Sequence, residues 1–228
     1  MTLRAEHHSG ADRRAALRAT YHHLVPEPVR RIMGFDAKGM VSLALWAARR
    51  RHGVPAQATA IPYASAQTAT MLLFLFAMIM ELVAVEVLLR AFGAPTGLRT
   101  AILVIDAYSI LIVLAVIAAC ITRPHVVSTE QVRIRYGAFF DLRIPREQIS
   151  DIRQARNFNE NNMVKVEDDR LTVAVASQTN LTLELTEPIT AVRPLGRRAE
   201  VRTIRFFADD PKAVFHALRS HQEPAPGS

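Results

Sequence analysis

Two long apolar runs, Met71–Leu89 and Thr100–Thr122, constrain this chain more than any other feature of its 228 residues. A helix needs about 20 residues to cross the hydrocarbon core of a bilayer, and each run is close to that length or longer. Lipid offers the backbone no hydrogen-bond partner, so each run is predicted to be helical throughout. The connecting residues 91–99 hold two glycines and a proline, which favour a tight turn. The sequence therefore predicts a two-helix transmembrane hairpin over residues 66–122.

The distribution of charge predicts how this hairpin is oriented. Residues 1–57 carry ten Lys and Arg against four Asp and Glu, and residues 58–122 carry two against three. Residues 123–228 carry sixteen against fourteen, and the connecting loop is flanked only by Arg90 and Arg99. Basic flanks stay on the cytoplasmic side of a membrane. We therefore expect a multi-pass protein of the cell (plasma) membrane with both termini in the cytoplasm.

Residues 1–60 are expected to form a cytoplasmic N-terminal region that contains an amphipathic helix. Apolar side chains between residues 36 and 52 precede three consecutive arginines at 49–51. This segment is too short to cross a bilayer, and its composition is typical of a helix that lies in the interface. Packing against the folded domain or another chain explains the pattern equally well. Trp46 and Tyr63 are expected interfacial anchors.

After Pro124 the hydrophobic pattern changes to a period of two. Apolar residues from Val132 to Tyr136 alternate with Arg133 and Arg135, and four later stretches repeat this alternation. Such a pattern is typical of half-buried antiparallel strands. The strand arginines are interpreted as one solvated face of a sheet, interleaved with acids such as Asp141.

The chain is expected to end in a helix followed by a tail. The triplet Asp209-Asp210-Pro211 predicts a helix N-cap and first turn before an apolar stripe. Residues 124–220 are therefore predicted to form a soluble cytoplasmic α+β domain. Residues 221–228 have the composition of a disordered tail.

Two short strings in this domain carry a family resemblance. The first consists of Thr129, Val132, Ile134 and Gly137, and the second of Ile144, Pro145, Ile149 and Ile152. With these residues the chain resembles bacterial pleckstrin-homology-like (PH-like) domain membrane proteins that carry a two-helix transmembrane hairpin. The resemblance spans about residues 70–220, hairpin included. It implies an antiparallel β-sheet or barrel capped by a C-terminal helix, and its motifs are structural rather than catalytic.

Three acidic residues inside the apolar runs are candidate intramembrane polar sites: Glu81, Glu86 and Asp106. A carboxyl group in lipid is costly and marks a functional site by default. Glu86 precedes Arg90 by four residues and is predicted to pair with it. At 1.5 Å per residue, Glu81 and Asp106 lie ~15 and ~12 Å from the outer turn, a similar depth. Two interpretations of these two acids stay open, namely helix–helix hydrogen bonding and a proton, cation or partner contact.

A basic cluster of Arg193, Arg197 and Arg198 is the candidate surface patch for anionic lipid or protein. The chain has one cysteine, Cys120, which excludes an intrachain disulfide. No nucleophile–base pair, metal-ligand spacing or phosphate-binding glycine motif is recognisable, so the sequence predicts no catalytic residues, no cofactor and no metal. The basic excess precedes the hairpin instead of covering the folded domain, which argues against a nucleic-acid partner.

These observations together predict a non-catalytic, membrane-anchored PH-like interaction or scaffold module at the cytoplasmic membrane face. Its expected partners are the lipid bilayer and either a protein partner or further copies in a homo-oligomer. The alternative is an accessory subunit of a transport or secretion complex that uses Glu81 and Asp106.

Overall fold

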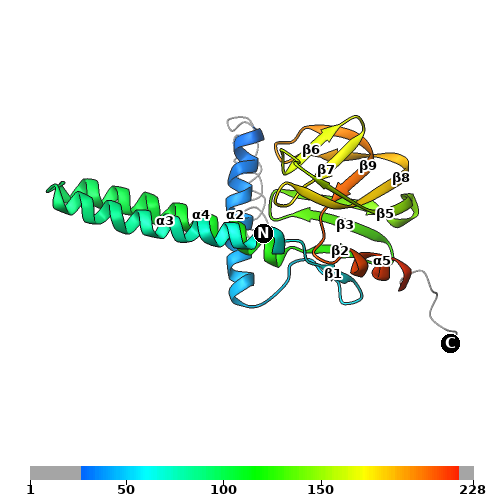
Figure 1. The fold of residues 1–228 in the computed structure, drawn as a ribbon, viewed down its shortest axis with the longest axis horizontal. Coiled ribbons are helices and arrows are strands. Elements are labelled where there is room, and N and C mark those ends of the chain that lie inside the picture. The colour runs from blue at the N-terminus through cyan, green and yellow to red at the C-terminus, as the bar shows by residue number, and fades with distance from the viewer. Residues whose placement is uncertain (1–26, 221–228) are drawn as a thin grey trace, which may run out of the picture.

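The computed structural model describes residues 27–220, as a helical hairpin that projects from a two-sheet β domain (Figure 1). The predicted tail, residues 221–228, and residues 1–26 lie outside the described residues. In chain order the elements are α2 (Glu27–Ala47), β1 (Thr59–Ile61), α3 (Ser65–Ala91), α4 (Thr96–Thr122), β2 (His125–Val127), β3 (Gln131–Tyr136), β4 (Phe140–Pro145), the 3-10 turn η1 (Arg146–Gln148), β5 (Ile149–Phe158), β6 (Val164–Glu167), β7 (Arg170–Val173), β8 (Gln178–Val192), β9 (Arg198–Phe206) and α5 (Pro211–Ser220).

The hairpin of α3 and α4 confirms the prediction of two long apolar helices joined by a tight turn. Both helices are long and apolar enough to cross a membrane. At the end of α3, Gly93 adopts a left-handed conformation with φ of 64°. The N–H groups of Gly93 and Ala94 donate to the carbonyls of Arg90 and Leu89, which closes the helix with a Schellman motif. This turn lies at the far end of the hairpin, away from the β domain (Figure 1).

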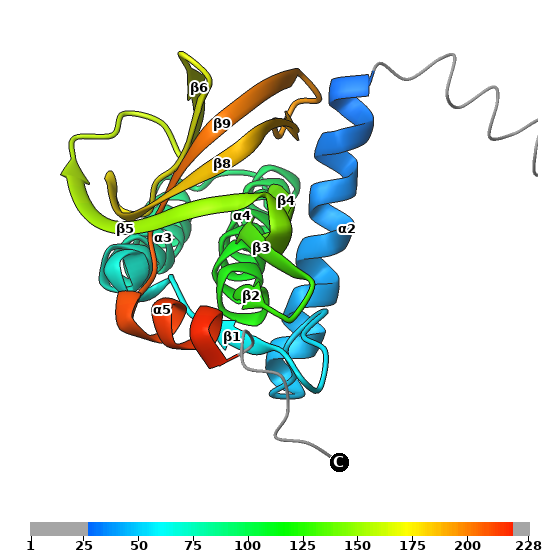
Figure 2. The ribbon, with the colours of Figure 1, turned by 90° about the vertical axis from the view of Figure 1, so that its right-hand side faces the viewer.

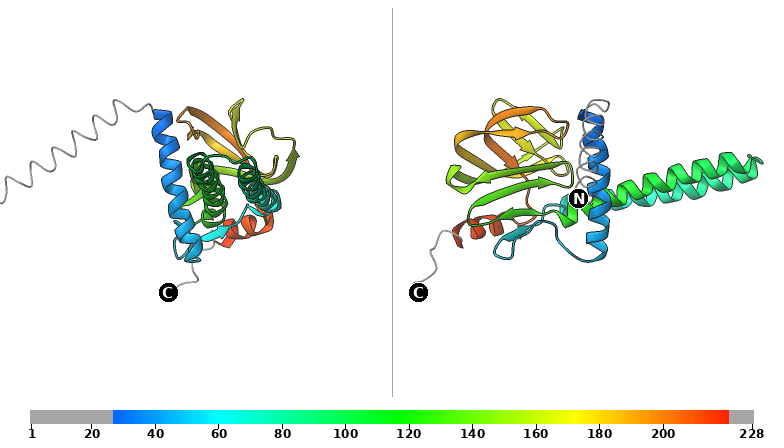
Figure 3. Two further views of the ribbon diagram at one scale, coloured as in Figure 1. Left: turned by 90° about the vertical axis from the view of Figure 1, so that its left-hand side faces the viewer. Right: turned by 180° about the vertical axis from the view of Figure 1, so that it is seen from behind.

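Helix α2 crosses the base of the hairpin at a steep angle and lies alongside the base of α4, on one side of the hairpin (Figures 1 and 3). The two helices cross closely at Gly39. A Cβ atom added there would lie only 3.2 Å from the Cβ atom of Ala115 in α4. Phe35 packs edge-on against Phe139 in the β3–β4 turn, with ring centroids 5.1 Å apart. The helix predicted within residues 36–52 instead runs from Glu27 to Ala47, so it begins earlier and ends before the three arginines. Its contacts to α4 and to the β3–β4 turn are packing contacts within the chain.

Two sheets form the β domain. The first has the strand order β1-β2-β3-β4 and the second the order β5-β8-β9-β7-β6. The sheets pack face to face, and α5 lies near β1 and β2 at one end of the domain (Figures 1 and 2). The structure thus confirms a helical hairpin joined to an α+β domain.

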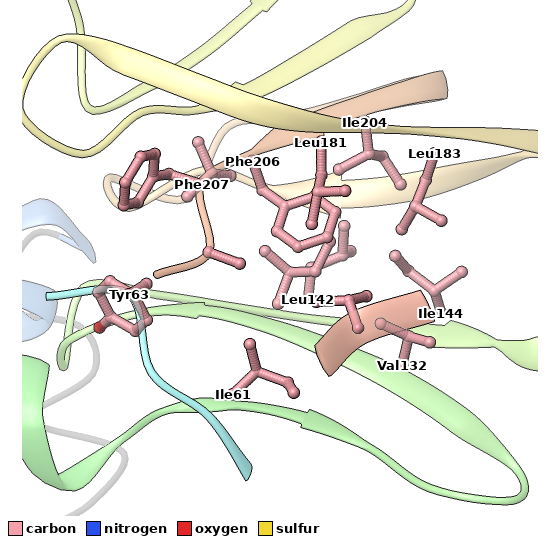
Figure 4. Packing of buried hydrophobic residues seen from close by; sticks show 14 of the residues in the cluster. Ile61, Tyr63, Val132, Leu142, Ile144, Leu181, Leu183, Ile204, Phe206 and Phe207 are labelled. Atoms are coloured by element: carbon pink, nitrogen blue, oxygen red, sulfur yellow. The ribbon is translucent and has the colours of Figure 1, made fainter. Parts of the chain in front are cut away.

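The hydrophobic core lies between the two sheets. Alternate residues of β4 are buried and exposed, as a period of two predicts. Figure 4 labels buried side chains that both sheets contribute, with these six among them: Leu181, Leu183, Ile204, Val132, Leu142 and Ile144.

The pairing of strand β1 shows where the hairpin is inserted in the β domain. It precedes α3, yet it pairs antiparallel with β2, which follows α4, and Ile61 lies opposite His125. The hairpin is therefore an insertion between two neighbouring strands of one sheet. Ile61 and Tyr63 from the segment before the hairpin are fully buried in the domain core (Figure 4).

The second sheet is mixed, where the sequence predicts antiparallel pairing throughout. β7 and β8 run in opposite directions but are not neighbours in the sheet, because β9 lies between them. β9 is antiparallel to β8 and parallel to β7, with Leu171 opposite Ile204. Alternation along the chain marks a strand but carries no information about its neighbours, so this pairing comes from the tertiary arrangement.

Candidate functional site at the base of the hairpin

Buried polar side chains connect the hairpin to the β domain. The hydroxyl of Tyr63 accepts a hydrogen bond of 2.6 Å from the backbone N–H of Gly137. The hydroxyl of Tyr136 donates to the side-chain carbonyl of Gln67 in α3 at 2.8 Å. Burial raises the pKa of Tyr136 to about 12, so this hydroxyl keeps its proton at neutral pH. Tyr63, expected as an interfacial anchor, is instead completely buried.

His125 is held in one neutral form. Its Nε2 lies 2.9 Å from the carbonyl oxygen of Phe207, and its Nδ1 accepts from the backbone N–H of Arg135 at 3.0 Å. A carbonyl can only accept and an N–H can only donate, so Nε2 carries the proton and Nδ1 does not. Burial lowers the pKa of His125 to about 4. The ring stacks on Tyr63 with centroids 4.6 Å apart.

Arg135 clamps the segment after α2 to strand β3. Its guanidinium donates to the backbone carbonyls of His52 at 2.8 Å and Gly53 at 3.1 Å. Only 2 % of its side chain is exposed, so its interpretation as part of a solvated sheet face was wrong. Burial lowers its pKa to about 10, which leaves it cationic at neutral pH. Arg133 does pair with the interleaved acid Asp141, through an Nε–Oδ1 contact of 2.6 Å.

The first residue of α3 is capped from the other end of the chain. The carboxylate of Asp209 accepts from the backbone N–H of Ser65 at 3.1 Å and from its hydroxyl at 2.5 Å. A carboxylate at a helix N-terminus satisfies a free N–H and complements the helix dipole. The adjacent Asp210 accepts from the backbone N–H of Lys212 at 2.9 Å and so caps α5, as predicted.

A cavity of about 390 Å³ opens where α2, α3 and α4 meet the β domain. We call it the junction cavity. It is lined by the end of α2 and the residues after it, the start of α3 and the end of α4, and its lining includes these side chains: Trp46, Arg49, Arg50, Arg51, Ser65, Thr68, Ile121 and Asp209.

The turn that ends α2 determines where the three arginines lie. Arg49 takes the left-handed conformation, with φ of 54°. The N–H groups of Arg49 and Arg50 donate to the carbonyls of Trp46 and Leu45. This is a Schellman motif with arginine at the position where glycine is usual. The chain reverses there, so that Arg49, Arg50 and Arg51 all line the junction cavity and are all exposed.

The acidic residues of the hairpin divide into two groups. Glu86 pairs with Arg90 at 2.7 Å, which confirms the predicted pairing, and it also accepts from Arg99 of the neighbouring helix. Glu81 is exposed and Asp106 is half-buried. Among the described residues, no hydrogen bond or ion pair joins these two acids. Both interpretations of Glu81 and Asp106 therefore stay predictions.

The predicted basic patch lies in the turn between β8 and β9. Arg193 and Arg197 line a shallow cavity, and Arg198 begins β9. The N–H of Arg193 donates to the carbonyl of Arg197 at 2.8 Å, which holds the turn closed. Figures 1 and 2 place this turn beside the N-terminal half of α2. The arginines at 49–51 follow the opposite end of the same helix.

Sequence reasoning missed most of the junction. Tyr63, Gln67 and His125 lie within eight residues of the ends of the two apolar runs, where polar residues pass as ordinary flanks. Two signals could have pointed to a special site: three consecutive arginines, and a histidine at the start of the first strand after the second apolar run. Neither signal identifies its contact partner, because those partners are up to 82 residues distant in the chain.

Comparison with protein-family models, curated proteins and solved structures finds no match to this chain. Between residues 27 and 220, no three His, Cys, Asp or Glu side chains are grouped so that they could hold a metal ion. Cys120, the single cysteine, is buried at the end of α4.

Proposed function

We propose that this chain is a non-catalytic, membrane-anchored interaction module. In this proposal α3 and α4 span the plasma membrane, both termini are cytoplasmic, and the β domain is a PH-like scaffold held at the cytoplasmic face. The PH-like assignment rests on the sequence resemblance and is compatible with two packed sheets and a C-terminal helix. A protein partner or a second copy of the chain would bind the surface that the domain presents.

The observation that carries the proposal is the insertion of the hairpin between β1 and β2. A tether made of a flexible linker would let the domain rotate freely above the bilayer. Here two strand connections, the Tyr63–Gly137 hydrogen bond and the Asp209 cap all join the hairpin to the domain. The anchor therefore determines which face of the β domain is turned toward the membrane, which is what an oriented scaffold requires.

Cysteine accessibility tests this topology. Because Cys120 is the single native cysteine, Cys120→Ala supplies a background into which Pro95→Cys in the α3–α4 turn or Gln178→Cys in the β domain is introduced. A membrane-impermeant maleimide should label position 95 in intact cells and label position 178 only after lysis. Labelling of position 178 in intact cells would contradict the proposal, and release of the chain by alkaline carbonate would contradict membrane anchoring.

An exposed acid favours the alternative of an accessory subunit in a transport or secretion complex. Glu81 is exposed on α3, in the middle of a helix that is apolar enough to span a membrane. A carboxyl facing lipid is expensive, so a neighbouring protein that covers this face would lower the cost.

The isosteric changes Glu81→Gln and Asp106→Asn test this alternative. In an accessory subunit they should remove a co-purifying partner while the abundance of the chain in membranes stays normal. If both variants retain their partners and abundance, the acids are structural and the alternative is rejected.

A further inference from the structure

We propose that the junction cavity binds the headgroup of an anionic glycerophospholipid from the cytoplasmic leaflet. The inference rests on the membrane-spanning hairpin of the proposed function and adds a ligand site to it. Four observations support it: the cavity itself, the charge that lines it, its position along the hairpin, and the backbone conformation of Arg49.

The lining of the junction cavity is amphipathic. Three exposed arginines line it, and exposed Trp46 and Ile121 contribute apolar surface. The acid in the lining, Asp209, already accepts two hydrogen bonds from Ser65. None of the ion pairs between described residues involves Arg49, Arg50 or Arg51. Guanidinium groups bind phosphate oxygens in a bidentate manner, and apolar side chains beside them suit the glycerol and first acyl carbons of a lipid.

The position of the cavity along the hairpin matches the headgroup layer. Helix α3 has 27 residues and is ~40 Å long, which exceeds the ~30 Å hydrocarbon core. The excess lies at the base, because residues 65–70 read SAQTAT and the apolar run begins only at Met71. Ser65 and Thr68, which line the cavity, therefore lie at the level of lipid phosphates. Trp46 is at the same level, where an indole is favoured.

Arg49 adopts a backbone conformation that is unfavourable for a residue with a side chain. A left-handed conformation costs an L-residue roughly 1–2 kcal/mol, and glycine would avoid this cost at the end of α2. Two contacts hold the following segment in place: the N–H of His52 donates to the carbonyl of Thr122 at 2.8 Å, and Arg135 clamps the next turn. The arginines are thus presented on a rigid support instead of a free loop.

The single tryptophan of the chain lies in the cavity, so Trp46 is a local reporter of lipid binding. The full-length protein in a neutral detergent is titrated with phosphatidylglycerol whose acyl chains are brominated near the headgroup, and separately with the matching brominated phosphatidylcholine. Bromine quenches an indole only at short range. We expect half-maximal quenching by phosphatidylglycerol at a concentration about tenfold or more below that of phosphatidylcholine, since each basic residue contributes to the binding of anionic lipid.

Matched variants separate this site from general electrostatic attraction. Replacing Arg49, Arg50 and Arg51 by glutamine should abolish the preference at Trp46, and replacing all three by lysine should keep most of it. The control replaces Arg143, Arg156 and Arg202 by glutamine, which removes equal charge from exposed positions of the β domain that do not line the cavity. This control should retain the preference.

Four results would overturn the inference. Equal quenching by the two lipids excludes an anionic headgroup site. If the control variant loses the preference for phosphatidylglycerol equally, the preference comes from the net charge of the protein and not from this cavity. Displacement of phosphatidylglycerol by millimolar inorganic phosphate identifies a site for free phosphate and not for lipid. An acidic protein that co-purifies and blocks quenching by both lipids would likewise replace the lipid as the ligand. Carbonate extraction of the same variants reports separately on membrane anchoring.

Discussion

The hydroxyl of Tyr63 accepts the backbone N–H of Gly137 across the boundary between the hairpin and the β domain, at 2.6 Å. Tyr63 precedes α3, and Gly137 lies in the β3–β4 turn with φ of 50°. A Cβ atom at position 137 would lie 3.3 Å from the sulfur of Cys120, so the turn fits closely over the end of α4. One hydrogen bond and one close contact therefore hold both helices of the hairpin against the same turn.

Removal of the Tyr63 hydroxyl should weaken this junction. Tyr63→Phe keeps the ring but leaves the buried N–H of Gly137 without an acceptor, which costs roughly 1–3 kcal/mol of unfolding free energy. Tyr108→Phe, at an exposed position of α4, is the matched control and should change stability little. Thermal unfolding in mild detergent, followed by near-ultraviolet circular dichroism, measures both. Equal melting temperatures for the two variants would mean that the hydrogen bond contributes nothing.

Acidification should destabilise the β domain through His125. Its pKa is about 4 in the folded protein and near 6.5 in an unfolded chain. Between these values the unfolded state binds more protons, so stability is present above about pH 6.5 and is lost as the pH falls toward 4. The loss should reach about 2 kcal/mol at pH 5. His125→Asn should flatten this part of the pH profile even if it lowers stability at pH 7.

Exposed His216 supplies the control for this titration. His216→Asn should leave the pH profile unchanged, because this side chain is exposed. An unaltered slope between pH 6.5 and 5 in the His125→Asn variant would show that another group causes the acid sensitivity. His52, whose pKa burial also lowers, is the first such group to test.

The boundaries of the independently folding unit should include β1. Residues 124–220, the range that the sequence indicates, lack the buried side chains of Ile61 and Tyr63. Loss of each large core side chain costs about 2–5 kcal/mol, a large share of the stability of a domain. We expect residues 124–220 alone to melt without cooperativity.

A second soluble version should restore cooperative folding. In it, residues 56–65 and 122–220 are kept and a short glycine-rich loop joins them in place of residues 66–121, so that β1 remains next to β2. This version should show a β-rich spectrum and a cooperative melt. Equal stability of the two versions would contradict the role of β1 in the domain.

The neighbouring acids Asp209 and Asp210 should have separable effects, since they cap different helices. Asp209→Ala removes the cap of α3 and should cost about 1 kcal/mol, with faster amide exchange around Ser65. Asp210→Ala should cost a similar amount but accelerate exchange at the start of α5. Hydrogen–deuterium exchange with peptide-level mass spectrometry distinguishes the two. Faster exchange at α5 in both variants would contradict separate capping.

Elements with strong local signals were predictable from the sequence. The hairpin follows from the length of two apolar runs, and its turn follows from Gly93 and Pro95. The strands follow from period-two alternation, and the cap of α5 follows from Asp210 next to Pro211. Each of these features depends on residues close together in the chain, where spacing alone carries the physical information.

The tertiary structure decided everything that depends on distant partners. Alternation could not assign β1, because three residues before a long apolar run carry too little pattern, and its partner β2 lies beyond the whole hairpin. It could not reveal that β9 lies between β7 and β8. Arg135 reads as a solvated strand arginine until the carbonyls of His52 and Gly53 are brought to it. Burial, hydrogen-bond partners and the junction cavity arise from contacts between segments that local spacing does not encode.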